Sequence, residues 1–256
     1  MTARPVTLVT GASAGLGVEF ARQCRAKGQE VVLVARRRER LEALAGELAG
    51  ELGGAHVVAA DLSDPGAPER LLEEVESLGL TVETLVNNAG FGAAGRFDLL
   101  PAERQAEMID LNVRALTLLC RLALPAMLSR GRGFILNVAS TAAFQAGPNM
   151  AVYYAGKAFV LSLTEALHQE TKGTGVHVTA LCPGPTATEF FEVAGAADGR
   201  LAKIATDPVA VVRAGLEGLA RNRAIVIPGV ANKVGAQANR LLPRAAMRRI
   251  VARIKA

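Results

Sequence analysis

A tyrosine, a lysine and a serine are spaced so that they could carry out proton transfer. Tyr153 lies four residues before Lys157 and thirteen after Ser140. On a helix, residues four apart share one face, and an ammonium beside a phenol lowers a pKa that starts near roughly 10. A phenol adjusted in this way can exchange a proton near neutral pH. The same residues could also be no more than the start of an amphipathic helix.

Tyr154 competes for the same role. The chain has only two tyrosines, and this second one stands three residues before Lys157. That spacing also brings two side chains together on a helix. Helix geometry alone leaves the choice open.

Apolar runs of strand length alternate with helical patterns, which is typical of βαβ units and a parallel sheet covered on both faces. The expected strands are residues 6–9, 30–35, 56–59, 84–86, 133–138, 176–181 and 225–227. The expected helices are residues 15–27, 38–52, 66–78, 102–130, 152–171 and 208–221. The pattern predicts an α/β fold: a single doubly wound Rossmann domain at 1–230 with a seven-stranded parallel sheet, followed by a tail at 231–256.

Composition excludes several classes of protein. Half of the 256 residues are hydrophobic, so a large core is available. No room for a signal peptide precedes the apolar run at 6–9, and no uninterrupted apolar run reaches the roughly 18 residues of a spanning helix. We therefore expect a soluble cytoplasmic protein.

The cysteines and histidines are scattered, at Cys24, Cys120, Cys182, His56, His168 and His177. Their spacing fits neither a Cys-x-x-Cys motif nor a zinc site, so we expect reduced core thiols and no metal. The net charge of +5 comes from the end of the chain, where residues 218–256 carry nine Lys or Arg and no Asp or Glu. A basic surface spread over the whole chain would suggest nucleic acid; this distribution does not, and we expect no such partner.

A glycine-rich turn follows the first expected strand and opens the first expected helix. It reads Thr10-Gly11-Ala-Ser13-Ala-Gly15-Leu16-Gly17. Glycines let the backbone approach a ligand closely, and a helix N-terminus offers free N–H groups to phosphate. A strand before this turn and a helix after it predict a dinucleotide site.

The residues after the second expected strand favour one dinucleotide. A carboxylate there would bind the ribose hydroxyls of NAD, whereas a cation prefers the 2′-phosphate of NADP. Ala35 is followed by Arg36, Arg37 and Arg38, and guanidinium groups match phosphate through a bidentate fork. We expect NADP(H) as the cofactor with Arg36 at the phosphate, and Arg38 and Arg40 as solvated helix residues.

Taken in order, these residues and others resemble the short-chain dehydrogenase/reductase family, in its compact single-domain branch, with some similarity to hydroxysteroid and long-chain ketoacyl reductases. The resemblance covers residues 6 to about 227. Its motif residues are Gly11-x-x-x-Gly15-x-Gly17, Asp61, Asn87-Asn88-Ala89-Gly90, Asn112, Ser140, Tyr153-x-x-x-Lys157 and Pro183-Gly184.

The resemblance implies a set of cofactor contacts. Asp61 would contact the adenine, and Thr186 and Thr188 would hold the nicotinamide amide and the pyrophosphate. The implied cofactor-binding residues are Gly11, Ser13, Gly15, Leu16, Gly17, Arg36, Asp61, Leu62, Asn88, Ala89, Gly90, Tyr153, Lys157, Pro183, Gly184, Thr186 and Thr188.

The catalytic residues implied by the resemblance are Asn112, Ser140, Tyr153 and Lys157. Hydride transfer to a carbonyl carbon builds negative charge on its oxygen. Tyr153 would give that oxygen a proton, Ser140 would hydrogen-bond it, and Lys157 would lower the phenol pKa and hold the nicotinamide ribose. Asn112 would position water in a relay to Lys157. The family spacing favours Tyr153 over Tyr154.

Phenylalanines surround the expected reaction centre at Phe91, Phe144 and Phe190-Phe191, without a cluster of Lys or Arg beside them. They favour a hydrophobic ketone, aldehyde or secondary alcohol, or they are core packing. Residues 186–206 are rich in small residues, which predicts a mobile substrate lid.

The tail places Met247, Ile250, Val251 and Ile254 on one helical stripe with arginines elsewhere. It could pack on a partner subunit, close over the substrate pocket, or lie on an anionic membrane surface.

These features predict an NADP(H)-dependent oxidoreductase that interconverts a carbonyl and an alcohol. A catalytically idle NADP-binding regulator or scaffold is the alternative, and a dehydratase or epimerase on the same fold is a third. By resemblance, the helices at 102–130 and 152–171 would pair across subunits in a homodimer or homotetramer.

Overall fold

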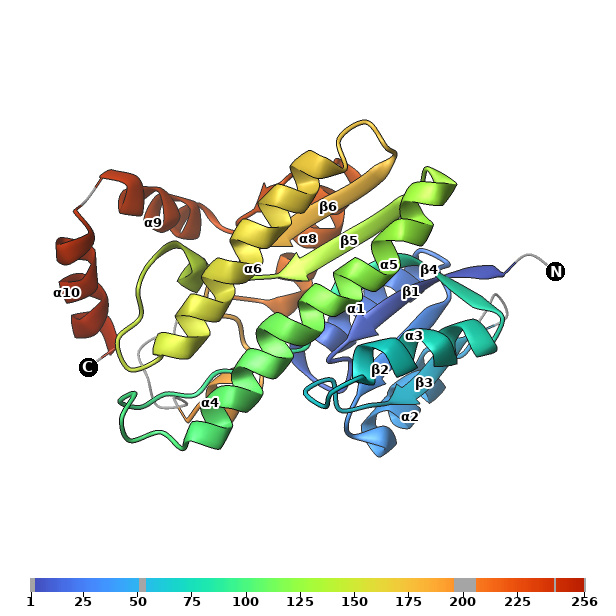
Figure 1. Cartoon of the computed structure of the whole chain (residues 1–256), viewed down its shortest axis with the longest axis horizontal. Helices are drawn as coiled ribbons and strands as arrows, with labels where there is room; N and C mark the ends of the chain where they lie inside the picture. The colour runs from blue at the N-terminus through green and yellow to red at the C-terminus, as the bar shows by residue number, and fades with distance from the viewer. Residues whose placement is uncertain (1–2, 51–53, 196–205, 242, 256) are drawn as a thin grey trace.

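Seven parallel strands form one sheet in the order β3-β2-β1-β4-β5-β6-β7 in the computed structural model, which describes residues 3–50, 54–195, 206–241 and 243–255 (Figure 1). The strands are β1 (Arg4–Thr10), β2 (Val31–Ala35), β3 (Ala55–Ala59), β4 (Leu80–Asn87), β5 (Gly133–Val138), β6 (Val176–Leu181) and β7 (Ile225–Val226). The chain builds outward from β1 to β3 and then crosses back to β4. The crevice outside the carboxyl ends of β1 and β4 is therefore the switch point at which such sheets bind ligands.

Helices cover both faces of the sheet. The larger ones are α1 (Gly15–Ala26), α2 (Arg38–Glu47), α3 (Ala67–Ser77), α4 (Ala102–Ile109), α5 (Leu116–Arg130), α6 (Ala151–Glu170) and α8 (Pro208–Ala220). One core cluster joins the sheet to α3, α5 and α6, and a second joins its other face to α1, α2 and α8. Figure 1 shows the α3, α5 and α6 layer in front of the strands. The predicted doubly wound fold is confirmed.

The helix expected at 102–130 contains a π-helical turn, η1 (Asp110–Ala115), between α4 and α5. The stretch Ala102–Arg130 is long and apolar enough to cross a membrane by length and composition, although it contains charged residues. In this structure, however, its apolar residues Leu116, Leu119 and Met127 are buried against the sheet. It therefore serves as a core helix of this fold.

Short elements connect the sheet to the predicted site: η2 (Thr141–Phe144), a 3₁₀ turn after β5, and α7 (Phe190–Val193), which follows β6. Thr186 forms an isolated parallel bridge with Thr206. This bridge joins the two ends of the predicted lid, whose residues 196–205 lie outside the described part of the chain.

The tail predicted at 231–256 forms two helices, α9 (Val230–Leu241) and α10 (Arg244–Lys255). Helix α9 packs closely on the turn after β6, because a Cβ on Gly184 would collide with the side chain of Asn232. Helix α10 places Val251 and Met247 in a cluster with Tyr153 and Tyr154. Of the predicted apolar stripe, Ile250 is 42% exposed, and the side chain of Ile254 is not described.

Candidate active site

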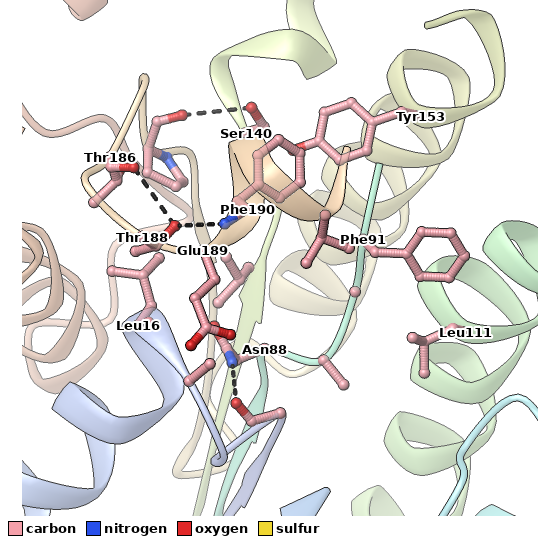
Figure 2. Close-up of a pocket in the computed structure, with 18 of the residues that line it drawn as sticks. Leu16, Asn88, Phe91, Leu111, Ser140, Tyr153, Thr186, Thr188, Glu189 and Phe190 are labelled. Carbon is pink, nitrogen blue, oxygen red and sulfur yellow. Dashed lines mark hydrogen bonds between the residues drawn. The ribbon is translucent and has the colours of Figure 1, made fainter. Parts of the chain in front are cut away.

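A cavity of about 420 Å³ lies outside the carboxyl ends of β1 to β6. Its walls include the glycine turn, the residues after β2, the Asn88–Gly90 segment, Ser140, the start of α6 and the segment after β6 (Figure 2). Nearly all the predicted site residues line it. Of the predicted site residues, all of which the structure describes, Gly17 and Asn112 are the two that do not line the cavity.

The glycine turn is shaped by contacts that only glycine permits. Gly11 and Gly15 have φ of 67° and 55°, a region that favours glycine, and a Cβ on Gly11 would lie 2.9 Å from Cα of Ala89. Gly17 faces the turn itself, where a Cβ would collide with the carbonyl oxygen of Gly11. Gly17 therefore permits close packing of α1 on the turn, and its contact with the cofactor stays a prediction.

The N-terminus of α1 opens on this cavity. Gly15 and Leu16 line the cavity, no side chain caps the helix, and its first turn holds no acidic residue. The N–H of Gly17 donates to the Ala14 carbonyl at 3.2 Å, which leaves those of Gly15 and Leu16 to an anion.

The ends of β1 and β4 are held together beneath the turn. The Thr10 hydroxyl accepts hydrogen bonds from the backbone N–H groups of Asn88 and Ala89, both at 3.0 Å. The Asn88 side chain donates to the Thr10 carbonyl at 2.9 Å. Asn88 thus fixes the spacing of the two strands at the switch point.

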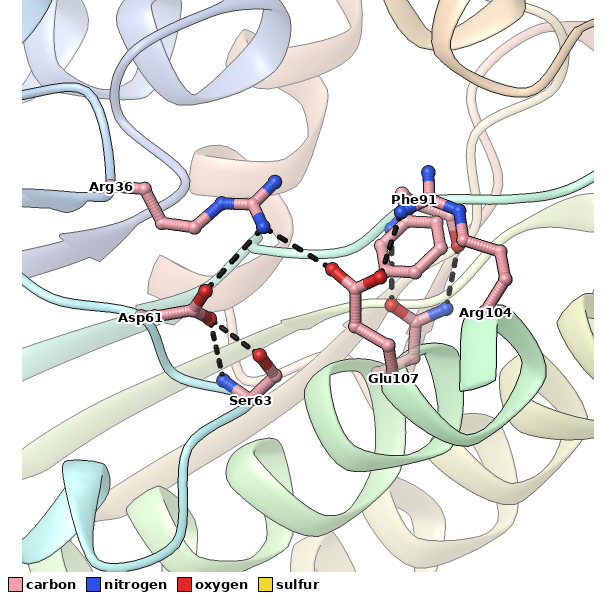
Figure 3. A network of polar contacts seen from close by, with 7 residues as sticks. Arg36, Asp61, Ser63, Phe91, Arg104 and Glu107 are labelled. Carbon is pink, nitrogen blue, oxygen red and sulfur yellow. Dashed lines mark hydrogen bonds and ion pairs between the residues drawn. The ribbon is translucent and has the colours of Figure 1, made fainter. Parts of the chain in front are cut away.

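Arg36 reaches the cavity beside two carboxylates (Figure 3). Its Nη1 lies 3.4 Å from Asp61 and 3.2 Å from Glu107, and its side chain is 58% exposed. Partial burial tends to raise the pKa of Asp61, but hydrogen bonds from Ser63 and the charge of Arg36 hold that pKa below its ordinary value. A cation with exposed donors at this point fits the predicted phosphate contact.

Arg37 also lines the cavity, which the sequence reasoning missed. Its Nε and Nη2 lie 3.2 and 3.1 Å from the Ser13 hydroxyl, and Nη1 lies 3.2 Å from Glu189. Arg40 meets the other oxygen of Glu189 at 2.6 Å, so it is not simply solvated as expected. The run of arginines after the second strand was a sequence signal for Arg37. No sequence signal pointed to its partner Glu189, which lies 152 residues away.

Tyr153, Ser140 and Lys157 meet on the opposite side of the cavity. Tyr153 is buried in the first turn of α6, and its ring packs at 5.2 Å from that of Phe190. Burial raises the pKa of Tyr153 above its ordinary value, and a side-chain hydrogen bond with Ser140 opposes this. The sequence predicts a lowered pKa for the Tyr153 phenol; in the structure, that pKa is instead raised. The buried phenol therefore stays protonated at neutral pH.

Lys157 is buried and turns its ammonium toward β5. Its Nζ donates to the Val138 carbonyl at 2.7 Å and lies 5.8 Å from the centre of the Tyr153 ring. Burial lowers the pKa of Lys157 to about 8.

Asn112 stands behind the cavity wall in the π-helical turn. Its side chain accepts from the Phe91 N–H at 3.1 Å and donates to the Phe91 carbonyl at 2.8 Å. Both bonds fix the segment after β4, and a Cβ on Gly90 would lie 2.8 Å from Asn112 Oδ1 and 3.6 Å from Lys157 Nζ. Asn112 thus supports the site next to Lys157, while the predicted water relay stays a prediction.

Tyr154 faces the cavity from the same helix. Its ring meets Tyr153 edge-on at 6.1 Å and packs so tightly on Gly147 that a Cβ there would collide with it. Burial raises the pKa of Tyr154 to about 12.

The end of the cavity around Tyr153 is apolar. It is lined by Phe91, Leu111, Met150, Phe190 and Val193. Phe144 packs in the core cluster instead, as the alternative interpretation expected, and the side chain of Phe191 lies outside the described set.

The model of the short chain dehydrogenase family matches residues 5–198. The chain belongs to the short-chain dehydrogenase family. The predicted resemblance is thus confirmed.

Relatives within the family differ in cofactor. A 7beta-hydroxysteroid dehydrogenase of Collinsella aerofaciens is 34% identical over 230 residues, 88% of this chain and 86% of the relative. A short-chain dehydrogenase structure from Sphingobium yanoikuyae in complex with NADPH has a TM-score of 0.82 at 32% identity, covering 93% of both chains. A Burkholderia phymatum family member in complex with NAD also has a TM-score of 0.82, at 26% identity and 92% coverage of both chains.

The residues present fit a dinucleotide. The glycine turn lets a ligand approach the backbone, the open N-terminus of α1 suits a pyrophosphate, and two arginines line the cavity after β2. The cavity joins this end to Tyr153 without interruption.

Proposed function

We propose that this chain is an NADP(H)-dependent oxidoreductase that interconverts a hydrophobic ketone or aldehyde and an alcohol. One observation carries the proposal: a single cavity has two arginines at one end and a buried Tyr153, paired with Ser140, at the other. Bound NADPH supplies the hydride. The arginines favour a 2′-phosphate, and the apolar lining around Phe91 and Phe190 favours a hydrophobic substrate.

Each side chain has a defined task in carbonyl reduction. Tyr153 donates its phenolic proton to the carbonyl oxygen, on which negative charge develops. Ser140 hydrogen-bonds the same oxygen and so orients the carbonyl. The Lys157 ammonium stabilises the phenolate that remains, and the Val138 carbonyl holds it in place. Asn112 keeps the Phe91 backbone in position through two hydrogen bonds.

Oxidation of NADPH in the presence of hydrophobic ketones and aldehydes tests the proposal. We expect turnover with part of such a panel, a lower rate with NADH, and loss of turnover in Tyr153→Phe. Tight NADPH binding without turnover of any carbonyl would support an idle NADP-binding regulator instead. Equal affinity for NADPH and NADH would overturn the cofactor assignment.

The assembly proposed is a homodimer or homotetramer through α4, α5 and α6. Ile109, Leu122, Leu128 and Phe159 on these helices are 36–49% exposed, and apolar side chains of this kind favour burial against a second copy. Sedimentation of a single 26.7 kDa species would overturn this proposal. The cytoplasmic location stays a prediction.

The basic tail is proposed to close over the substrate end. Met247 and Val251 pack in the cluster that contains Tyr153, which supports this use over a membrane surface. Co-sedimentation with anionic vesicles compares the full chain with one truncated after residue 243. Equal recovery of both forms would remove the membrane option, whereas loss of binding on truncation would restore it.

A further inference from the structure

One carboxylate in the cavity wall faces the arginines expected to bind phosphate. Glu189 lines the cavity directly after Thr188 and before α7. Its two oxygens take different partners: Oε2 lies 3.2 Å from Arg37 Nη1, and Oε1 lies 2.6 Å from Arg40 Nη1. Hydrogen bonds from Arg40 and Arg37 hold the pKa of Glu189 below its ordinary value. The carboxylate is therefore charged at neutral pH.

The Arg37 guanidinium would have to rearrange its contacts with Glu189 to bind a phosphate. Its Nε and Nη2 contact Ser13 of the glycine turn, and Nη1 and Nη2 both contact Glu189. A phosphate at the cavity side of Arg37 would have to replace the carboxylate or lie next to it. Two anions sharing one guanidinium repel each other, and the partly exposed setting screens this only in part.

We propose that Glu189 is a specificity-determining residue for the cofactor: its carboxylate competes with the 2′-phosphate for Arg37 and thereby reduces the preference for NADP(H) over NAD(H). The inference rests on the proposed use of NADP(H). Arg40 already binds the other oxygen of Glu189 and remains its partner when Arg37 turns to the phosphate.

Glu107 beside Arg36 does not compete in the same way. Its second oxygen lies 2.8 Å from Arg104, whose guanidinium also stacks 3.8 Å above the Phe91 ring (Figure 3). Glu189 has a second partner as well, in Arg40. The difference lies in position, because Glu189 lines the cavity and Glu107 is not among the described residues that line it.

Binding of two nucleotides that differ only in the 2′-phosphate tests this inference. Calorimetry on the full chain compares 2′,5′-ADP with 5′-AMP. We expect Glu189→Gln to tighten 2′,5′-ADP binding by about three- to fivefold, the upper part of the range for exposed charge pairs, and to leave 5′-AMP binding within about twofold. Glu192→Gln is the matched control, because it removes the same charge from the exposed side of α7.

A double variant locates the effect. In an Arg37→Ala background, Glu189→Gln should no longer tighten 2′,5′-ADP binding, because the contested guanidinium is absent. Unchanged or weaker binding of 2′,5′-ADP by Glu189→Gln overturns the inference, as does equal tightening of both nucleotides or an equal effect of Glu192→Gln. If the unaltered protein binds none of these nucleotides, the proposed cofactor fails as well. If it binds 2′,5′-ADP and only the Glu189 effect is missing, the proposed function stands.

Discussion

The ammonium of Lys157 donates a hydrogen bond to the carbonyl oxygen of Val138 over 2.7 Å. Val138 ends β5, which pairs with β4 and β6 in the middle of the sheet. Rigid backbone therefore fixes the position of a buried cation on the Tyr153 side of the cavity. Burial lowers the pKa of Lys157 to about 8. The ammonium therefore loses its positive charge within the pH range in which enzyme assays can be run.

The rate of carbonyl reduction is expected to depend on this charge. The pKa of Lys157 lies below its ordinary value of 10.5, at about 8, so the ammonium is fully formed well below that pH and is lost as pH rises through it. Burial keeps the Tyr153 phenol protonated over the same range. We expect kcat/KM to fall about tenfold per pH unit above roughly pH 8.

Initial rates of NADPH oxidation between pH 6 and pH 10 measure this profile. Lys172→Gln is the control, because Lys172 is exposed beyond the end of α6 and its loss should leave the profile unchanged. A rate independent of pH up to 10 would refute the role of the Lys157 charge.

The two tyrosines should respond differently to loss of the hydroxyl. Tyr153→Phe keeps the ring contacts with Phe190 and Tyr154 but removes the proton donor. We expect kcat to fall by about 10²–10⁴-fold, with a much smaller change in the affinity for NADPH. Tyr154→Phe should keep kcat within about tenfold, because its proposed role is packing on Gly147. The opposite pattern in steady-state rates would reassign the donor to Tyr154.

Arg36→Ala should selectively weaken NADPH binding. Charge-assisted hydrogen bonds to phosphate contribute roughly 1.5–3 kcal/mol, so we expect the Kd for NADPH to rise about 10- to 100-fold while the Kd for NADH stays constant. Fluorescence titration measures both values. Arg38→Ala is the control, since Arg38 is exposed and lies 3.7 Å from Glu42 within α2. An unchanged Kd for NADPH in Arg36→Ala would overturn the phosphate assignment.

Local patterns predicted the strands and most of the helices because parallel strands are buried on both faces. Val31–Ala35, for example, is a continuous apolar run. The π-helical turn at Asp110–Ala115 could not be predicted in this way. It surrounds Asn112, whose hydrogen bonds to the Phe91 backbone join residues 21 positions apart.

The residues that line the site were predictable where a motif marked them, as with Ser140, Tyr153 and Lys157. Their electrostatics were not. The sequence indicates that Lys157 is near Tyr153, but only the structure shows that burial, rather than the ammonium, governs the phenol pKa. Likewise, the Arg37–Glu189 pair joins segments 152 residues apart, and no local pattern reveals such a contact.

Helix α10 should determine how well a bulky substrate binds. Val251 is 5% exposed and packs in the cluster with Tyr153 and Tyr154. Val251→Asp would bury an unpaired carboxylate. The free-energy cost of this burial exceeds what the packing of α10 on the Tyr153 cluster contributes, so α10 should move away from the cluster. We expect the KM of a bulky hydrophobic ketone to rise about tenfold, because apolar area covering the substrate is lost, with no change in the Kd for NADPH.

Ile250→Asp is the matched control for this change. It places the same charge one residue earlier, on a side chain that is 42% exposed, where the carboxylate remains in water. Its KM should stay within about twofold of the unaltered protein. If both variants raise KM equally, the effect comes from the added charge on a basic helix. If neither does, α10 does not cover the substrate end, and its contact with the Tyr153 cluster contributes to stability alone.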